Sequence, residues 1–320
     1  MSSGHSDDPG ARLVAEARAG DRRALARLLT EMENRTAAGE AAVRILYREA
    51  GGAHLVGLTG PPGVGKSTLV AGLVAEARTA GRSVAVLAID PSSPITGGAL
   101  LGDRVRMQQH AGDDGVFIRS MAARGRLGGL AGATAEAASA MDACGFGLVL
   151  IETVGTGQSE VEVASLADTT VVLQAPDMGD EVQALKAGLL EVADLVVVSR
   201  ADRPGAQRAA ARLRAMLGPS GADVLLASGT TGEGVAELLV ALDRHAGEGR
   251  DSEDQARARL ARARAQVEAI VEDRTRARSR SAALQATSDD IFAAVAAHEL
   301  DPYAAADRLI EALRADAASG

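Results

Sequence analysis

The residues with the most specific chemistry lie in one short segment, residues 60–67, which reads Gly-Pro-Pro-Gly-Val-Gly-Lys-Ser and fits the phosphate-binding pattern G-x-x-x-x-G-K-[ST]. Its glycines let successive backbone N–H groups curl around phosphates, and the helix expected after it adds positive potential. We expect Lys66 to reach the β- and γ-phosphates and the Ser67 hydroxyl to bind Mg²⁺. An apolar run before the loop and a helical run after it argue against a chance Gly/Pro turn. The expected nucleotide contacts are Gly60, Pro61, Pro62, Gly63, Val64, Gly65, Lys66, Ser67 and Thr68.

Acidic residues that directly follow apolar, strand-like runs are the candidate metal ligands. Glu152 begins Glu-Thr-Val-Gly155, where GTPases usually carry Asp-x-x-Gly, and Asp90 begins Asp-Pro-Ser-Ser-Pro. Ligands bind at the carboxyl ends of strands in open α/β folds, so both carboxylates are candidates for a Mg²⁺ shell, and Gly155 for a γ-phosphate sensor. Asp103 is a weaker candidate, which a helix N-cap would explain equally well. For Glu152 the alternative is a surface turn.

A third motif, Ser199-Arg-Ala-Asp202, follows another strand-like run, where GTPases carry Asn-Lys-x-Asp. The Asp of that motif accepts two hydrogen bonds from the guanine edge, which adenine cannot supply. Arg200 can lie over a base face as Lys would, whereas Ser199 cannot reproduce the Asn amide. We therefore expect guanine preference to survive in a weakened form, with an unrelated charged loop as the alternative. The backbone N–H groups of a later loop are expected to contact the base as well, from Ser228, Gly229 and Thr230.

Strand-like and helical segments alternate through the middle of the chain and position these motifs. Several of the apolar runs lack period-2 alternation, as strands covered on both faces should. The alternation predicts an α/β fold, a P-loop three-layer sandwich with a mainly parallel sheet, between helical extensions at both ends. We expect a helical extension over 1–50, a nucleotide-binding domain over 51–248 and a helical arm over 249–320. The predicted strands are 54–59, 83–90, 115–120, 146–152, 169–175, 194–199 and 223–227.

Composition narrows the class of protein further. The net charge is −9, so no global field draws the chain to nucleic acid or anionic lipid. We expect the basic run 274–280 to pair with nearby acidic side chains. The single cysteine, Cys144, excludes an intramolecular disulfide. The N-terminus lacks the pattern of a secretory signal and no run is long enough to span a bilayer, so we expect a cytoplasmic protein with no membrane partner.

Four segments together resemble one family, the methylmalonyl-CoA mutase-associated GTPases of the MeaB or ArgK type: 60–68, 90–104, 152–160 and 179–194. The resemblance implies a homodimeric GTPase that binds GTP, GDP and Mg²⁺ and dimerises through its C-terminal helices. It also implies a cobalamin-dependent acyl-CoA mutase as partner, with adenosylcobalamin loading gated and the mutase protected or reactivated. Asp90, Asp103 and Glu152 look like the family's magnesium and switch carboxylates. Residues 180–186 look like an additional switch, in which Lys186 has a catalytic role; read alone, these are charges near a helix start.

Two departures from the family leave alternatives open. Ser199-Arg200 replaces Asn-Lys, and the C-terminal region lacks the usual aromatic residues, so the partner could be a related mutase. A P-loop ATPase or kinase linked to amino-acid transport is one alternative, although no Arg-rich lid is evident. A non-hydrolysing interaction protein is another. The intact residues Lys66, Ser67, Asp90 and Glu152 argue against it. Without a recognisable arginine finger, we expect slow hydrolysis that a partner stimulates.

Overall fold

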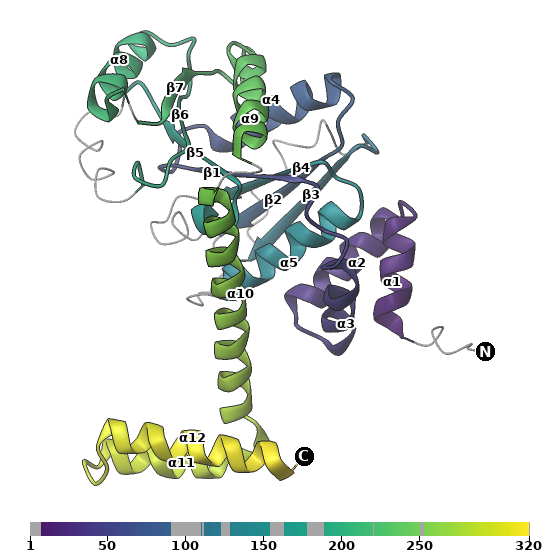
Figure 1. Ribbon diagram of the computed structural model, residues 1–320, viewed down its shortest axis with the longest axis vertical. Helices are drawn as coiled ribbons and strands as arrows, with labels where there is room; N and C mark the ends of the chain where they lie inside the picture. Colours follow the sequence, from purple (N-terminus) through teal and green to yellow (C-terminus); the bar gives the residue numbers. More distant parts are fainter. Residues whose placement is uncertain are drawn as a thin grey trace. The chain divides into compact units, whose positions relative to one another are not determined.

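The computed structural model describes residues 8–90, 110, 112–122, 129–153, 163–177, 189–219, 221–249 and 253–319. The chain forms two compact units, residues 1–262 and residues 263–320, which are described separately below. Figure 1 labels their helices and strands.

The core of the first unit is a seven-stranded sheet in which every neighbouring pair of strands runs parallel. The strand order is β3-β2-β4-β1-β5-β6-β7. All seven predicted strands are present, and the predicted parallel α/β class is confirmed. The strands are β1 (His54–Thr59), β2 (Val84–Asp90), β3 (Val116–Ala122), β4 (Leu148–Thr153), β5 (Thr169–Gln174), β6 (Leu195–Val198) and β7 (Asp223–Leu226).

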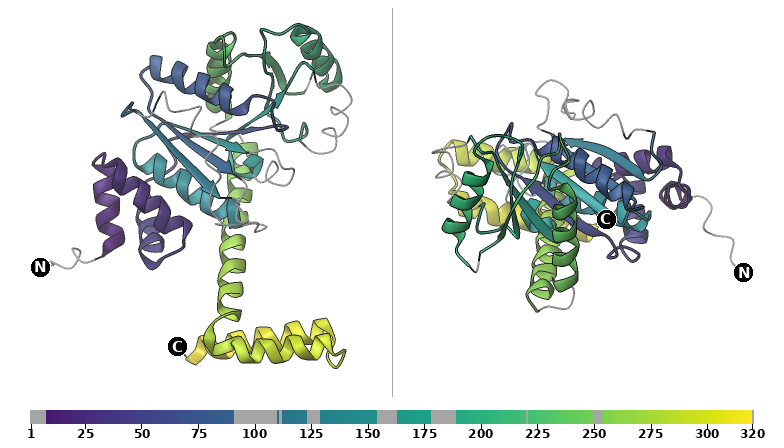
Figure 2. Two further views of the ribbon diagram at one scale, coloured as in Figure 1. Left: turned by 180° about the vertical axis from the view of Figure 1, so that it is seen from behind. Right: turned by 90° about the horizontal axis from the view of Figure 1, so that it is seen from above.

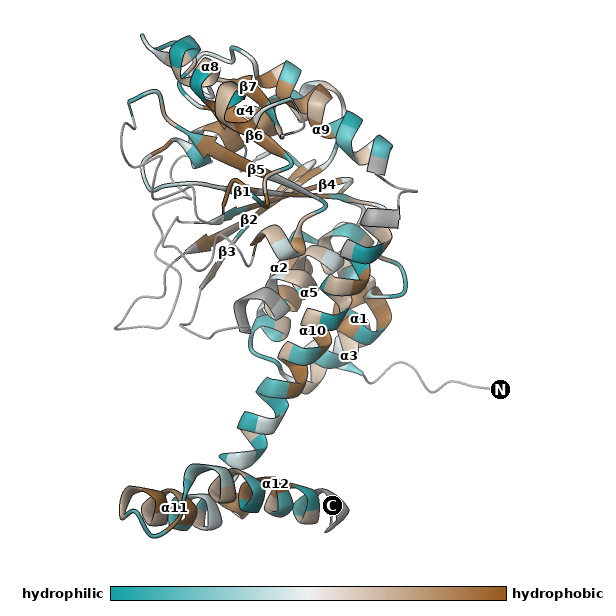
Figure 3. Cartoon of the chain, turned by 60° about the vertical axis from the view of Figure 1, so that its left-hand side comes forward, coloured by the Kyte–Doolittle hydropathy of each residue, from teal (hydrophilic) through white to brown (hydrophobic). Residues whose placement is uncertain are grey.

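Helices cover both faces of the sheet, and Figure 2 shows α4 and α5 on opposite sides of it. Leu148 and Leu150 of β4 belong to the apolar cluster that includes α4 and α9, whereas Val149 and Ile151 belong to the cluster that includes α5. Because both faces are covered, strands such as β4 and β6 carry runs of consecutive apolar residues, which explains the missing alternation. The brown strands of Figure 3 show the same pattern. The helices are α4 (Lys66–Thr79), α5 (Gly129–Ala143), α8 (Ala206–Leu217) and α9 (Val235–Gly249).

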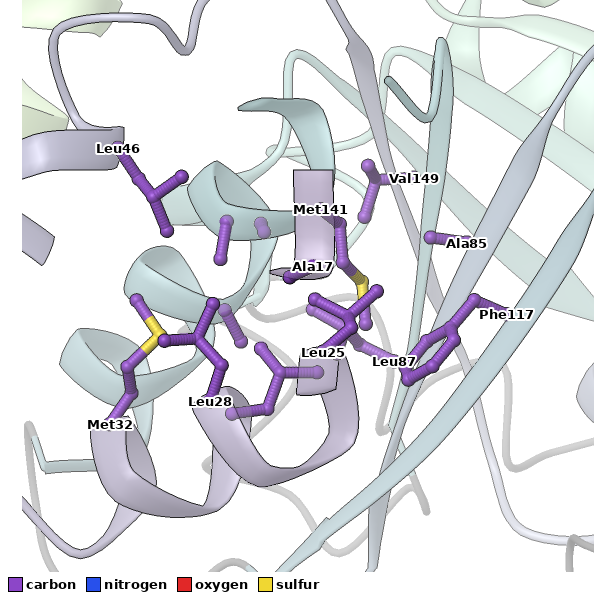
Figure 4. Close-up of a cluster of buried hydrophobic side chains, with 14 of the residues drawn as sticks. Ala17, Leu25, Leu28, Met32, Leu46, Ala85, Leu87, Phe117, Met141 and Val149 are labelled. Carbon is purple, nitrogen blue, oxygen red and sulfur yellow. The ribbon is translucent and has the colours of Figure 1, made fainter. Parts of the chain in front are cut away.

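Three N-terminal helices extend the same core. Each begins at a polar N-cap whose side chain accepts backbone N–H bonds. The buried side chains Leu25, Leu28 and Met32 of the second helix share a cluster with Met141 of α5 and Phe117 of β3 (Figure 4). The N-terminal helices therefore belong to the compact unit that contains the sheet. They are α1 (Pro9–Arg18), α2 (Arg22–Glu33) and α3 (Ala37–Leu46).

The second unit is helical, as predicted, and contains the last part of α10 with α11 and α12. Leu284, Ile291 and Ala305 are buried in it. Asp301 caps the last helix by accepting the N–H groups of two first-turn residues, both at 3.0 Å, directly before a proline at the first helical position. None of the described helices combines the length and apolarity needed to cross a bilayer. The helices are α10 (Glu253–Ser279), α11 (Ala282–Ala296) and α12 (Pro302–Ser319).

The basic run lies on the surface of the second unit and pairs with acidic neighbours. Arg276 contacts Glu272 one turn earlier on α10, and Arg278 Nε lies 2.8 Å from a carboxylate oxygen of Asp316 on α12. These two arginines are therefore paired within the unit, as the sequence predicted for the run, although the Asp316 partner was not foreseen.

Candidate functional site

The Gly-rich loop connects β1 to α4 in a conformation that its glycines permit. Gly60, Gly63 and Gly65 have φ values of 144°, 75° and 103°, in the region that favours glycine. A Cβ on Gly60 would also lie 2.6 Å from the carbonyl oxygen of Leu173 on β5. Gly65 is the N-cap of α4 and has no side chain to cap the first-turn N–H groups, which form the positive end of the helix.

The two reactive side chains of the loop are buried at its exit into α4. Lys66 Nζ donates to the carbonyl oxygens of Gly60 at 2.6 Å and Pro61 at 3.0 Å, so the ammonium is held against the loop itself. Ser67 Oγ donates to Glu152 Oε1 at 2.6 Å. Glu152 is 4 % exposed, near the end of β4, which is hydrogen-bonded to β1. The structure thus brings together the predicted lysine, hydroxyl and carboxylate.

The Ser67 hydroxyl and the Glu152 carboxylate fit a magnesium ion in their chemistry. Both present hard oxygen atoms, which Mg²⁺ prefers, and they meet beside the loop expected to hold phosphate. Asp90 is the last residue of β2, which pairs with β4 and ends at the same edge of the sheet. Of the other predicted site residues, Asp103, Gly155 and Lys186 lie outside the described residues.

Ser199 and Arg200 contact the Gly-rich loop, which the sequence did not predict. The Ser199 hydroxyl, in a residue 3 % exposed, lies 2.6 Å from the Val64 carbonyl oxygen and 3.0 Å from that of Gln174. The Arg200 guanidinium donates to the Gly63 carbonyl oxygen, and its Nη1 is 3.8 Å from Asp177 Oδ2. The predicted base-recognition segment is therefore tied directly to the predicted phosphate loop.

Asp202 is held by the loop that follows β7. A hydrogen bond from the Ser228 side chain lowers the pKa of the Asp202 carboxyl, so this group is an anion and an acceptor at neutral pH. A Cβ on Gly229 would lie 2.2 Å from the Thr68 carbonyl oxygen, so only glycine allows residues 228–230 to approach the first turn of α4 so closely. Gly229, one of the predicted base contacts, thus lies against the phosphate loop's own helix.

Most of these residues line one cavity of about 610 Å³, a volume typical of small-molecule sites. Arg200 forms part of its wall together with the loop after β7. Thr153, which sequence reasoning missed, lines it as well. The lining residues are Pro62, Gly63, Gly65, Lys66, Ser67, Thr68, Glu152, Thr153, Arg200, Ser228, Gly229 and Thr230.

A second polar cluster lies where the strands begin, and we call it the amino-edge cluster: His54, Thr169, His245 and Asp194. The Thr169 hydroxyl lies 2.8 Å from His54 Nε2 and 2.7 Å from His245 Nδ1, and His245 Nε2 is 3.4 Å from Asp194 Oδ1. Burial lowers the pKa of His54 to about 4, whereas the hydrogen bond to Asp194 raises the pKa of His245. His54 is therefore neutral at neutral pH.

A cavity of about 220 Å³ adjoins this cluster and is lined in part by His54. Its acidic groups have partners within the protein. Asp168 pairs with Arg262 at 2.8 Å and accepts the Leu55 N–H, while Asp142 accepts the N–H groups of residues 51–53. Because these carboxylates are already satisfied, the arrangement is that of a structural polar cluster.

A lysine-bearing glycine loop that opens a helix at the carboxyl edge of an all-parallel sheet defines the class of this molecule as a P-loop nucleotide-binding protein. The family model described as "Methylmalonyl Co-A mutase-associated GTPase MeaB" matches residues 25–284. The chain belongs to this family and is a GTPase. The resemblance read from the four sequence segments is thereby confirmed.

Individual relatives agree with this assignment. A Pyrococcus horikoshii relative is 43% identical over 308 residues, which cover 93% of this chain and 96% of that protein. GTPase ArgK of Escherichia coli is 39% identical over 193 residues, covering 59% of this chain and 58% of ArgK. A crystal structure named as LAO/AO transport system kinase matches with a TM-score of 0.66 over 98% of this chain and 100% of that chain. At 24% identity, that match shows the fold alone.

Proposed function

We propose that this GTPase assists a cobalamin-dependent acyl-CoA mutase, methylmalonyl-CoA mutase or a relative of it. In this role it gates the loading of adenosylcobalamin and protects or reactivates the mutase. The family's description supports the choice of partner. A Caenorhabditis briggsae relative named "Methylmalonic aciduria type A homolog, mitochondrial" is 39% identical over 212 residues, covering 61% of this chain and 52% of that protein. The nucleotide part of the proposal rests on the cavity in which Lys66, Ser67 and Glu152 meet.

Lys66 would bind the triphosphate by exchanging hydrogen-bond acceptors. Its Nζ donates to two loop carbonyls in the structure, Gly60 and Pro61, so the ammonium is already positioned at the phosphate loop. A phosphate oxygen carries negative charge, so it attracts the Lys66 ammonium more strongly than a neutral carbonyl oxygen does, and the exchange favours the bound state. The first-turn N–H groups of α4 add further donors.

Ser67 and Glu152, with Asp90 and Asp103 as the further carboxylates, are the residues we propose to hold Mg²⁺. When bound, the ion neutralises charge on the β- and γ-phosphates. Glu152 accepts the Ser67 hydroxyl, so the two groups that would hold the ion already lie side by side. For Gly155 and Lys186 we propose the γ-phosphate-sensing and switch roles that the family resemblance implies.

Guanine is recognised in this proposal by Asp202. Its carboxylate is ionised and is held by Ser228, so it can accept two hydrogen bonds from the guanine edge. Adenine lacks that pair of donors, so the contact selects GTP over ATP. Gly229 and Thr230 line the cavity that also contains Lys66 and Ser67, and they can offer backbone N–H groups to the base.

The second unit supports a proposed dimerisation arm. Large apolar side chains stand exposed on its helices: Val267 is 60 % exposed, Val271 58 %, Phe292 58 % and Tyr303 86 %. Val267 and Val271 are one helical turn apart on α10, the spacing of a contact seam between helices. We propose that a second copy of this chain covers these residues, so that residues 249–320 act as a dimerisation arm. Light scattering of the full chain checks this, and a monomer at micromolar concentration would contradict it.

Two measurements on the purified protein test the proposed function. Calorimetry with Mg²⁺ and either GTP or ATP should show tighter binding of GTP, and equal affinities would remove guanine recognition from the proposal. A pull-down from source lysate with a non-hydrolysable GTP analogue should retain an acyl-CoA mutase. GTP hydrolysis should then be faster with that mutase than without it. Equal rates would contradict the chaperone role while leaving the GTPase assignment intact.

A further inference from the structure

We propose that the amino-edge cluster is a hydrogen-bond relay, in which the protonation state of His245 at one end sets the tautomer of His54 at the other. The relay runs from Asp194 through His245 and Thr169 to His54. His54 and Thr169 are the first residues of β1 and β5, whereas the phosphate loop follows the last residue of β1. The relay is therefore separate from the nucleotide cavity, and it goes beyond the proposed function without resting on it.

The Thr169 hydroxyl is the centre of the relay, because it meets two ring nitrogens but carries only one proton. Thr169 is buried, and its oxygen lies 2.8 Å from His54 Nε2 and 2.7 Å from His245 Nδ1. A hydroxyl donates one hydrogen bond and can accept two. It can therefore donate to only one of the two rings, and the other ring must donate an N–H to its oxygen.

Asp194 fixes the direction of the hydrogen bonds when His245 is neutral. His245 Nε2 lies 3.4 Å from Asp194 Oδ1, and a carboxylate only accepts, so the single ring proton belongs on Nε2. Asp194 is itself held in place, because its Oδ2 accepts the Thr170 N–H at 2.7 Å and its own N–H donates to the Thr170 carbonyl at 3.0 Å. His245 Nδ1 then accepts the Thr169 proton, and the Thr169 oxygen accepts the Nε2–H of His54. The neutral His54 ring consequently has no proton on Nδ1.

Protonation of His245 reverses the direction of these hydrogen bonds. The imidazolium donates from both nitrogens, so Nδ1 changes from an acceptor to a donor toward the Thr169 oxygen. The Thr169 proton then needs a new acceptor, which His54 Nε2 supplies when the ring carries its proton on Nδ1 instead. If the tautomer did not change, two N–H groups would face one oxygen and the Thr169 proton would lose its acceptor. In total, His245 gains one proton from water, while His54 exchanges its Nε2 proton for one on Nδ1 and stays neutral.

Two features leave His54 free to change its tautomer. Its Nδ1 is buried and makes no hydrogen bond within the part of the chain that the structure describes. The hydrogen bond made by one ring nitrogen sets whether the other carries the proton, so Thr169 alone decides the tautomer of His54. Burial also lowers the pKa of His54 to about 4, so the ring keeps a single proton over the pH range in which His245 titrates.

The surroundings of His245 place the change above pH 6.5 and connect it to solvent. The hydrogen bond to Asp194 raises the pKa of His245 above its usual value of 6.5, and burial opposes this rise. The His245 and Asp194 side chains are 30 % and 37 % exposed, so a proton can reach them from water. The relay thus carries a change in charge at the surface to a buried nitrogen. The other charged groups around the two rings are Arg82, Asp168, Asp243 and Glu248.

Ring ¹⁵N NMR spectra of the full-length protein, recorded from about pH 5.5 to pH 8.5, test the relay because they distinguish protonated from unprotonated ring nitrogens. As the pH falls and His245 becomes charged, the protonated nitrogen of His54 should change from Nε2 to Nδ1 with the same midpoint. Spectra of His54→Gln assign the His54 signals. An unchanged His54 tautomer on both sides of the His245 transition would overturn the proposal.

Two threonine variants test whether the hydroxyl carries the change. Thr169→Val removes the central hydroxyl with little change in shape, so the His54 tautomer should lose its dependence on pH. Thr170→Val removes the hydroxyl of the next residue, outside the relay, and should keep the wild-type change. A tautomer change that survived in Thr169→Val would refute the relay. If Thr169→Val failed to fold, the wild-type spectra would still decide, because the relay requires the His54 and His245 transitions to coincide.

Discussion

The two ends of the same strands carry polar clusters that differ in how their hydrogen bonds can change. At the amino edge, His54 and His245 both bond the Thr169 hydroxyl, and the neighbouring carboxylates are paired. At the carboxyl edge, Lys66 donates to carbonyls of its own loop and Ser67 to Glu152, beside a cavity of about 610 Å³. Both clusters contain buried polar side chains, His54 and Thr169 in one and Lys66, Ser67 and Glu152 in the other, so burial does not separate structure from function. The distinction is whether a ligand can take over the existing hydrogen bonds.

Replacing Lys66 should produce the largest effect, because it removes the ammonium that we expect to move onto phosphate. Lys66→Met keeps the apolar stem, so we expect the fold to persist while GTP hydrolysis falls about 10³-fold. Turnover and thermal melting measured together check this. The control Arg203→Met should change neither, and a melting temperature that fell along with activity would assign Lys66 to the structural side of the comparison.

The second largest effect should come from acid, which destabilises the folded protein through the amino-edge cluster. The pKa of His54 is about 4 in the folded protein and 6.5 in the unfolded chain, so the unfolded state binds the proton first. Neutral His54 therefore contributes to the free energy of unfolding above pH 6.5, and this contribution is lost as the pH falls toward 4. For this pKa shift it amounts to at most about 3 kcal/mol. Urea unfolding of wild type and His54→Gln between pH 7 and pH 4.5 tests this prediction. If the free energy of unfolding fell equally with pH in the two proteins, His54 would not be the source of the acid sensitivity.

Glu152→Gln should lower hydrolysis about 10²-fold with little change in folding, because an amide oxygen still accepts the Ser67 hydroxyl but carries no charge for a cation. The measurement is turnover against Mg²⁺ concentration. We expect the half-saturating Mg²⁺ concentration to rise. A drop in turnover at unchanged Mg²⁺ dependence would show that Glu152 acts without the metal.

Replacing His245 should have the smallest effect on the free energy of unfolding. Its pH dependence should be opposite to that of His54, because the contribution is lost at high pH instead of low pH. Asp194 raises its folded pKa above 6.5, so its stabilising contribution is complete below pH 6.5 and is lost as the pH rises through the folded value. His245→Gln should flatten the small decline in unfolding free energy on the alkaline side of pH 6.5. If the variant kept that decline, the contact between His245 and Asp194 would not be its source.

Local patterns in the sequence were enough for the strands, the phosphate loop and the family. The runs 54–59 and 169–175 coincide with strands β1 and β5 to within one residue, because a strand buried on both faces needs neighbouring apolar residues. The Gly-rich loop was recognisable for a similar reason: its backbone demands glycine at positions close together in the chain. The roles given to Asp103, Gly155 and Lys186 remain predictions.

The sequence by itself therefore determined the fold class and the chemistry of the loop, since periodicity and conformational preference act between near neighbours. Only the tertiary structure decided what Ser199 does. Its partner Val64 is 135 residues away, and His54 and Thr169 are 115 residues apart. Such contacts depend on which strands become neighbours and on the direction of each side chain. No local pattern around Ser199 or His54 carries that information, so a residue that looked like a lost donor proved to be a buried contact to the phosphate loop.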